Sequence, residues 1–321
     1  MPDPAETHSP QVLAVLKLAP LFASQLTATF TVHDRLHETD AAAFAAVAPR
    51  IRAIAASGES KVGDALMARL PALRMISVMG VGYDGIDVAA AKARGVTVSH
   101  TPDVLNDDVA DMAIGLMLGA ARQLPAADRY VRDGHWPGGP MPLARKMSGA
   151  RLGLIGMGRI GQAIAHRALA FGMSIAYTTR TPRPDLPYRH LPDATALAAV
   201  SDFLVVITPG GAGTRHLVDA QVLAALGTKG ILVNVARGTV VDEAALIDAL
   251  EQGVIGGAGL YVFEDEPNVP ERLRKLPHVV LAPHIGSATG QTRQAMADRA
   301  FANLRAFFDG TPLPSAVPEC R

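Results

Sequence analysis

The chain has 321 residues, enough for two domains of ordinary size, and 49% of them are hydrophobic while 19% are charged. Its 30 basic residues balance 30 acidic ones, which argues against a protein that binds nucleic acid or an anionic membrane. The single cysteine, Cys320, permits no internal disulfide, and neither an export signal nor a bilayer-length apolar run is present, so we expect a cytoplasmic protein.

The first hundred residues alternate predicted strands with predicted helices. Short apolar runs predict strands at 11–18, 51–55, 74–79 and 96–99, and helices are predicted at 41–47, 66–70 and 88–94. Gly95 follows the last of these helices as its C-terminal cap. Such alternation is typical of a parallel sheet covered by helices.

A long helix is predicted next, after the helix-start signal Thr101-Pro102-Asp103, because apolar residues then recur at helical spacing as far as Met117. Segment 124–148 interrupts this pattern and is rich in proline and glycine. It also carries the only tryptophan, Trp136, which favours an ordered arm over a flexible linker.

A second and longer alternating series begins at Arg151. Strands are predicted near 151–155, 173–177, 203–207, 230–235, 256–260 and 278–281, with helices near 159–171, 220–226 and 242–252 and a closing helix over 289–309. A long helix at each crossing between the two series indicates that the chain returns to its first domain at its end. We therefore predict an α/β protein with two Rossmann-like, doubly wound parallel sheets.

A glycine-rich turn follows the first strand of this second series. Its residues are Gly156, Met157, Gly158, Arg159, Ile160 and Gly161. The spacing alone is weak evidence, but here it follows a strand and opens a helix, which is the context of a dinucleotide-binding fingerprint. The glycines permit a tight turn and close approach of a pyrophosphate to the amides at the helix N-terminus.

The end of the next predicted strand bears on the choice of nicotinamide cofactor. An acid about 20 residues after the fingerprint would bind the ribose hydroxyl of NAD. This chain instead has Thr179 and Arg180 there, and Asp185 comes too late, beyond two prolines. A surface arginine is common, but the missing acid favours NADPH (NADP+), with NADH still possible.

Three strand ends supply candidate catalytic residues. Arg237 ends the apolar strand 230–235, where a substrate carboxylate and a structural acid are equally good partners on this evidence alone. Glu-Asp-Glu-Pro at 264–267 and His284 follow the next two strands, so all three segments can converge at one edge of a parallel sheet. A histidine paired with a carboxylate is the usual general acid for protonating a carbonyl as hydride arrives, and an arginine would polarise that carbonyl.

Together these segments resemble the D-isomer-specific 2-hydroxyacid dehydrogenase family over nearly the whole chain. The resemblance rests on Val-Gly-Tyr-Asp-Gly-Ile-Asp at 81–87, Thr-Pro-Asp-Val-Leu at 101–105, the fingerprint, Asn-Val-Ala-Arg-Gly at 234–238, Glu-Asp-Glu-Pro at 264–267 and Pro-His-Ile-Gly-Ser at 283–287. Within the family, the chain is most similar to NADPH-preferring glyoxylate/hydroxypyruvate and hydroxyphenylpyruvate reductases.

The resemblance implies NADPH-dependent reduction of a small 2-keto acid to the D-2-hydroxy acid. It matches Arg237, Glu266 and His284 to the catalytic triad, with Glu266 rather than Glu264 as the acid. Substrate contacts are expected at Ser57, Val81, Gly82, Arg237 and His284, and no metal is expected. Further cofactor contacts are expected at Thr208, Pro209, Val235, Ala236, Tyr261 and Gly286.

The resemblance also implies how the chain is divided. Residues 1–100 and 286–321 would form a discontinuous, flavodoxin-like substrate-binding domain, and residues 101–285 a Rossmann domain that binds the dinucleotide, with a cleft between them. A homodimer built on the helix after Thr101 is expected.

One residue departs from the family's pattern. Where the family usually has Leu-Asp-Val-Phe, with an Asp that meets the nicotinamide carboxamide or the active-site network, this chain has Tyr261. We expect activity to survive with a shifted pH optimum.

Three other functions are compatible with parts of the pattern. A relative on the same fold could oxidise a small anion such as phosphite or formate, and a regulatory protein that senses NAD(P)H could keep the same triad. A purely structural Rossmann module is the weakest alternative, because it would not need His, Glu and Arg at three strand ends.

Overall fold

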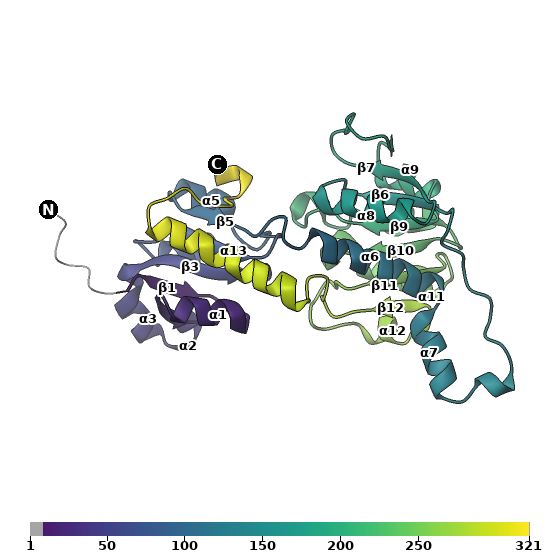
Figure 1. Cartoon of the computed structure of the whole chain (residues 1–321), viewed down its shortest axis with the longest axis horizontal. Coiled ribbons are helices and arrows are strands. Elements are labelled where there is room, and N and C mark those ends of the chain that lie inside the picture. The colour runs from purple at the N-terminus through teal and green to yellow at the C-terminus, as the bar shows by residue number, and fades with distance from the viewer. Residues whose placement is uncertain (1–8, 321) are drawn as a thin grey trace. The chain divides into compact units, whose positions relative to one another are not determined.

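The structure is a computed structural model that describes residues 9–320 (Figure 1). Residues 1–8, which belong to the amino terminus in which no export signal was expected, lie outside the described residues. The chain divides into two compact units, of which the first extends to Leu105 and resumes at Ala288, and the second comprises Asn106–Ser287. No helix within residues 9–320 is long and apolar enough to cross a membrane.

The first unit is built on a parallel sheet of five strands in the order β2-β1-β3-β4-β5. The strands are β1 (Gln11–Ala14), β2 (Thr31–Asp34), β3 (Ile51–Ser57), β4 (Met75–Met79) and β5 (Thr97–Ser99). The helices are α1 (Pro20–Thr27), α2 (Leu36–Thr39), α3 (Ala41–Val47), α4 (Asp64–Ala68), α5 (Val88–Ala93) and α13 (Gly290–Phe308). The last helix of the chain is thus part of the first unit.

Side chains along β4 alternate between the two faces of this sheet, as a pleated strand requires. Ser77 donates a hydrogen bond of 2.9 Å to the carbonyl oxygen of Ala300 in α13. Its neighbours Ile76 and Val78 lie in the core that also contains Phe44 of α3. Both faces are therefore covered by helices, which explains why the strands are apolar almost throughout.

The second unit is built on a parallel sheet of seven strands in the order β12-β11-β10-β9-β6-β7-β8. The strands are β6 (Arg151–Ile155), β7 (Ser174–Thr178), β8 (Arg189–His190), β9 (Phe203–Val206), β10 (Ile231–Asn234), β11 (Gly257–Leu260) and β12 (Val279–Leu281). The helices are α6 (Asn106–Ala121), α7 (Leu124–Arg132), α8 (Arg159–Leu169), α9 (Ala194–Ala199), α10 (Ala220–Leu226), α11 (Glu243–Glu251) and α12 (Glu271–Arg274).

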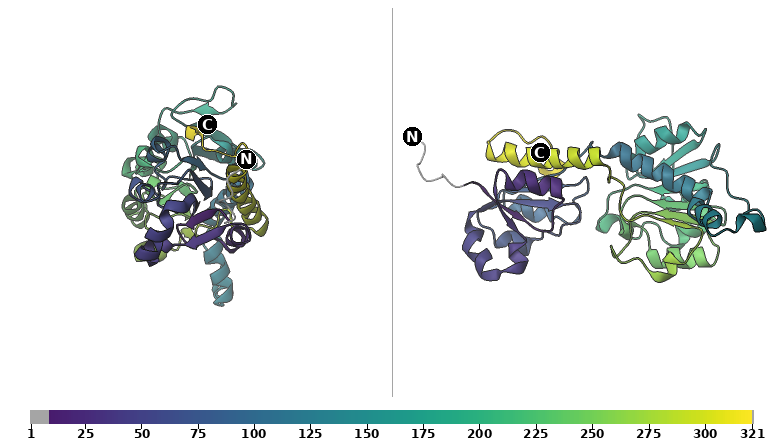
Figure 2. Two further views of the ribbon diagram at one scale, coloured as in Figure 1. Left: turned by 90° about the vertical axis from the view of Figure 1, so that its left-hand side faces the viewer. Right: turned by 60° about the horizontal axis from the view of Figure 1, so that its bottom comes forward.

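The direction of winding in the second unit reverses at β6, which lies between β7 and β9. Helices lie on both faces of this sheet (Figure 2). Helices α6 and α8 pack on each other, and α6 also contacts β10, β11 and β12. Helix α10 packs against both α9 and α11, and these three helices share a core with the sheet. In such open sheets the point of reversal is where ligands bind, beyond the carboxyl ends of the strands. The predicted fold class, two doubly wound parallel sheets, is confirmed.

Two predicted features of the second unit differ in detail. The long helix begins at Asn106 and not directly after the predicted start signal Thr101-Pro102-Asp103. Asp103 has a left-handed φ of 71°, and residues 103–105 form a bend that precedes the helix. The predicted arm contains a nine-residue helix, α7, and then a loop that extends away from the rest of the second unit (Figure 1). The hydroxyl of Tyr130 donates to the carbonyl oxygen of Gly139 at 2.8 Å, which ties this loop back to the helix.

Candidate active site

The predicted site residues of the second unit lie beyond the carboxyl ends of its strands. The fingerprint follows β6, Thr179 and Arg180 follow β7, Thr208 and Pro209 follow β9, Val235, Ala236 and Arg237 follow β10, Tyr261 and Glu266 follow β11, and His284 and Gly286 follow β12. Because all these strands are parallel, their carboxyl ends lie at one edge of the sheet. Six separate segments therefore lie along this edge.

The three fingerprint glycines have different surroundings. Gly156 has a φ of 107°, and a Cβ there would lie 2.5 Å from the carbonyl oxygen of Ile207, so no other residue fits. A Cβ at Gly161 would lie 2.5 Å from the carbonyl oxygen of Gly156. Gly158 is exposed, has nothing within 4 Å of its Cβ position, and caps the 11-residue helix α8 without a side-chain cap. Two glycines therefore shape the turn, and the third leaves backbone open to a phosphate.

The loop after β7 carries a half-buried threonine and an exposed arginine. Thr179 donates from its hydroxyl to the carbonyl oxygen of Thr181 at 2.7 Å, and its own carbonyl oxygen lies 3.2 Å from Nε2 of His190. Arg180 is exposed and makes no hydrogen bond or ion pair with any residue that the structure describes. The acid that would bind the ribose hydroxyl of NAD is missing from this loop in the sequence, and Asp185, the next acid, is engaged with Arg183 at 2.7 and 2.9 Å. These residues fit a dinucleotide that carries an extra phosphate.

Arg237 is held at the end of β10 by the turn that precedes it. Asn234 is 1% exposed, and its side chain accepts from Ala236 N at 3.0 Å and donates to the carbonyl oxygen of Arg237 at 3.0 Å. Nη1 of Arg237 donates to the carbonyl oxygen of Ala236 at 2.8 Å. A Cβ at Gly238 would lie 1.9 Å from the carbonyl carbon of Phe263, so this glycine lets the loop after β11 approach Arg237. Asn234 and Gly238 are structural residues of the site; the sequence included both in the motif at 234–238 but assigned neither of them a role.

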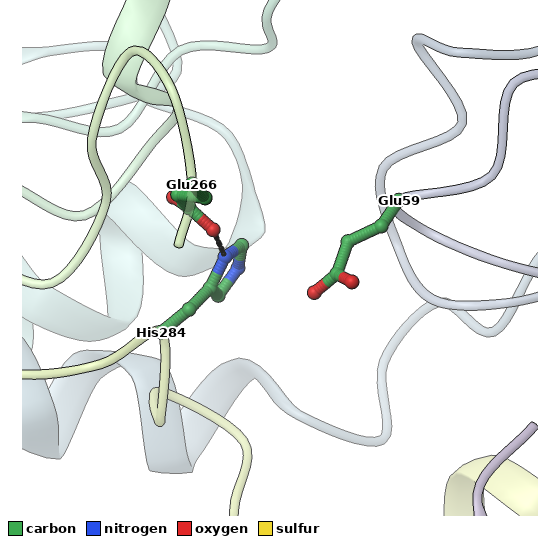
Figure 3. Close-up of side chains that lie close together, drawn as sticks. All are labelled: Glu59, Glu266 and His284. Atoms are coloured by element: carbon green, nitrogen blue, oxygen red, sulfur yellow. Dashed lines mark hydrogen bonds and ion pairs between the residues drawn. The ribbon is translucent and has the colours of Figure 1, made fainter. Parts of the chain in front are cut away.

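His284 and Glu266 form a hydrogen-bonded pair (Figure 3). Nδ1 of His284 lies 2.7 Å from Oε2 of Glu266, and the other carboxylate oxygen accepts from Phe263 N at 3.0 Å. The two side chains are 33% and 27% exposed. Glu264, the other glutamate of the run, pairs instead with Arg215 at 2.8 Å. The structure thus brings Glu266, and not Glu264, to the histidine, and leaves the second ring nitrogen directed away from the carboxylate.

The charge state of Glu266 follows from its partners. Burial raises the pKa of Glu266. The hydrogen bonds from His284 and Phe263 N, together with the charges of His284 and Arg237, lower the pKa by more than burial raises it, so the pKa lies below the ordinary 4.5. The carboxylate is therefore ionised at neutral pH. It can keep Nδ1 of the imidazole engaged and stabilise the protonated form of the ring.

This lowered pKa predicts a dependence of stability on pH. Glu266 binds its proton less tightly in the folded chain than in the unfolded chain, so its stabilising contribution is present above the unfolded pKa and is lost as the pH falls through the lower folded pKa. We expect the difference in unfolding free energy between wild type and Glu266→Gln, measured by urea denaturation, to be smaller at about pH 3 than at about pH 5. An equal difference at both pH values would contradict the ionised pair.

The predicted substrate residues Ser57, Val81 and Gly82 belong to the first unit. A Cβ at Gly80 would lie 3.1 Å from the Cα of Gly58, so the loops that follow β3 and β4 pack backbone against backbone and bring these residues together. Nδ1 of His100 lies 3.0 Å from the carbonyl oxygen of Val81. No sequence pattern indicated a role for His100, because its partner is a backbone atom.

The chain is similar to known proteins over most of its length. A family model described as D-isomer specific 2-hydroxyacid dehydrogenase, NAD binding domain, matches residues 114–286. The chain is 50% identical over 267 residues to glyoxylate/hydroxypyruvate reductase A of Arabidopsis thaliana, covering 83% of this chain and 85% of that protein. It is 46% identical over 270 residues to hydroxyphenylpyruvate reductase of Plectranthus scutellarioides, covering 84% and 86%.

A solved structure is similar over almost the full length. It is the NADPH-dependent glyoxylate/hydroxypyruvate reductase of Sinorhizobium meliloti in complex with NADP and malonate, which has a TM-score of 0.92 and 46% identity and covers 97% of this chain and 98% of that chain.

Proposed function

The chain belongs to the D-isomer specific 2-hydroxyacid dehydrogenase family and is an NAD(P)-dependent oxidoreductase, and we propose that it reduces a small 2-keto acid to the D-2-hydroxy acid with NADPH. Glyoxylate, hydroxypyruvate and hydroxyphenylpyruvate are the substrates to consider, since similar proteins bear those names. The observation that carries the proposal is the His284–Glu266 pair, 2.7 Å apart, near Arg237 at the sheet edge that also carries the fingerprint.

The proposed roles follow from the donors and acceptors at this edge. Arg237 binds the substrate carboxylate, because a planar guanidinium matches its two oxygens. Residues 156–161 would hold the dinucleotide, which when bound would supply the hydride that the carbonyl carbon accepts. His284 donates a proton from Nε2 to the carbonyl oxygen, while Glu266 keeps Nδ1 engaged and so fixes which nitrogen faces the substrate. The half-exposed imidazole then recovers a proton from solvent. Ser57, Val81 and Gly82 stay predicted substrate contacts.

The reaction class is tested by the loss of reduced-nicotinamide absorbance with hydroxypyruvate, run in parallel with NADPH and NADH. We expect rapid oxidation that favours NADPH. Turnover that favours NADH would contradict the cofactor preference but not the reaction. No detectable oxidation of either cofactor with any of the three keto acids would contradict the proposed function and favour a regulatory protein that senses the dinucleotide.

Arg180 is proposed to bind the extra phosphate of NADPH. A charge-assisted hydrogen bond contributes about 1.5–3 kcal/mol, so we expect Arg180→Ala to raise the KM for NADPH by about tenfold or more and to change the KM for NADH much less. Arg189→Ala is the matched control. Arg189 is also exposed, and this substitution removes the same charge from the neighbouring strand β8. Equal effects on both cofactors would contradict the assignment.

We also infer a homodimer in which the arm after α6 contacts a second copy of the chain. Several large apolar side chains of the arm are exposed: Leu124 by 53%, Val131 by 56%, Trp136 by 66% and Leu143 by 100%. Solvent exposure of such a group is costly unless a partner covers it. Light scattering is expected to give twice the chain mass for wild type and the single-chain mass for Trp136→Glu with Leu143→Glu. Leu169→Glu, at an exposed leucine of α8, is the control that should stay dimeric.

A further inference from the structure

Tyr261 is the first residue after β11 and is only 4% exposed. Its backbone joins two neighbouring segments of the candidate active site. Its N–H donates to the carbonyl oxygen of Asn234 at 3.4 Å, and its own carbonyl oxygen accepts from His284 N at 2.8 Å. His284 has a left-handed φ of 46°, which this backbone bond helps to maintain. The position of His284 thus depends on Tyr261 already at the level of the backbone.

The buried side chain of Tyr261 contacts Val235, His284 and Gly286. Its hydroxyl donates to the carbonyl oxygen of Val235 at 3.1 Å, and the centroid of its ring lies 5.4 Å from that of His284 at an interplanar angle of 40°. A Cβ at Gly286 would lie 2.9 Å from both Cζ and the hydroxyl oxygen. The ring is therefore held by a hydrogen bond at its tip and packs directly against a glycine.

The phenol stays neutral at working pH. Burial raises the pKa of Tyr261 to about 12, the charge of Arg237 lowers it, and the charge of Glu266 raises it. The charged or titratable groups that act on the ring are thus Arg237, Glu266 and the adjacent His284. Tyr261 therefore supports the imidazole without gaining or losing a charge during turnover.

A single hydrogen bond to Glu266 decides which ring nitrogen faces the carboxylate, but it tolerates a range of angles and so permits the imidazole plane to tilt. A neighbouring aromatic ring restricts this rotation, since the two rings have preferred relative orientations. We propose that Tyr261 is a positioning residue for His284: its ring sets the plane of the imidazole, and Gly286 is the residue that leaves room for the ring. This inference rests on the proposed function and deepens it, because it assigns how the proton donor is aimed.

Two substitutions separate the ring of Tyr261 from its hydroxyl. Tyr261→Phe keeps the ring, and we expect kcat within about threefold of wild type. Tyr261→Leu removes the ring, and we expect kcat to fall by about tenfold or more while the KM for NADPH changes less, because misplacing a catalytic group by about 1 Å costs up to about a hundredfold. Wild-type kcat in Tyr261→Leu, or equal losses in both variants, would overturn the proposal. Thermal denaturation establishes that each variant is folded.

A readout that does not need turnover distinguishes this proposal from the proposed function. The ring signals of His284 are identified in NMR spectra by their loss in His284→Gln. Mobility of the ring, and not its chemical shift, is the readout, because loss of the neighbouring aromatic ring changes the shift by itself. We expect NMR relaxation of these signals to show a more mobile imidazole in Tyr261→Leu than in wild type or Tyr261→Phe, whichever substrate the enzyme takes. Unchanged relaxation of the His284 signals in Tyr261→Leu would overturn the positioning role even if the enzyme reduces keto acids. Increased mobility in an enzyme inactive on all three keto acids would sustain the positioning role and overturn only the function.

The role of Gly286 is tested by a double-mutant cycle. Gly286→Ala is expected to lower kcat by about tenfold or more in wild type, because its methyl group would collide with the Tyr261 ring. In the Tyr261→Leu background the same substitution is expected to have a clearly smaller effect, since the ring is gone. An identical loss in both backgrounds would show that Gly286 acts independently of Tyr261 and would overturn this part of the proposal.

Discussion

Replacing His284 with alanine is expected to lower kcat for hydroxypyruvate by about a hundredfold or more, the usual scale for loss of a general acid. The imidazole is the titratable group that Glu266 holds at 2.7 Å, and its exposed edge can exchange protons with solvent. Without it, the oxygen of the reduced carbonyl must take its proton from water. The cofactor should still bind, because the fingerprint residues lie beyond a different strand, β6.

The matched control for this prediction is His278→Ala. His278 is also half-buried and precedes β12, but it lies at the opposite end of that strand from His284. We expect near-normal kcat in His278→Ala and unchanged NADPH binding, measured by fluorescence titration, in both variants. Near-normal turnover in His284→Ala would refute the assignment of the proton donor. Loss of NADPH binding in that variant would show that its low turnover has another cause.

The sequence predicted the strands that carry the site because each of them lies in a short apolar run. The alternation of strands with helices predicts the parallel arrangement, and that arrangement places Arg237, Glu266 and His284 at one sheet edge. The fingerprint was predictable for a similar reason, since the glycines at 156 and 161 meet backbone that only a glycine can approach. The roles of these residues stay predictions until they are measured.

Other features could not be predicted, because they depend on contacts between segments distant in sequence. Helix α1 and strand β2 were not predicted. Phe30, which lies between them, packs on Phe301 and Phe308 of α13, about 270 residues further along the chain. Helix α9, which begins after the capping residue Asp193, was missed because it is only six residues long. The contact between Gly238 and Phe263 joins two loops, and no local sequence pattern predicts it.

Tyr261 illustrates the same limit within the site. The sequence identified it as a departure from the family's pattern, and from that alone a shifted pH optimum was expected. Only the structure shows that its hydroxyl is bonded to Val235 and that its ring packs against His284 and Gly286. The shifted pH optimum stays a prediction. The contacts favour an effect of Tyr261 on the orientation of the imidazole.

Replacing Arg237 with alanine is expected to reduce kcat/KM for the keto acid by about a thousandfold or more. A charge-assisted bond to the carboxylate contributes about 1.5–3 kcal/mol, and loss of a donor that stabilises the developing oxyanion costs about 2.7–4 kcal/mol. Even the lower values add to about 4 kcal/mol, or roughly a thousandfold. The bond from Nη1 to the carbonyl oxygen of Ala236 holds the guanidinium at the end of β10, so the group is positioned before substrate arrives.

Arg237→Lys distinguishes charge from geometry. Lysine keeps the positive charge but lacks the planar fork, so we expect it to recover only a small part of the lost kcat/KM. Added guanidinium ion should restore part of the activity of Arg237→Ala, because it can enter the space that the side chain leaves, and it should not help Arg237→Lys. If Arg237→Ala kept its kcat/KM for the keto acid but lost stability, the arginine would be the structural partner of an acid, which was the alternative that the sequence alone left equally open.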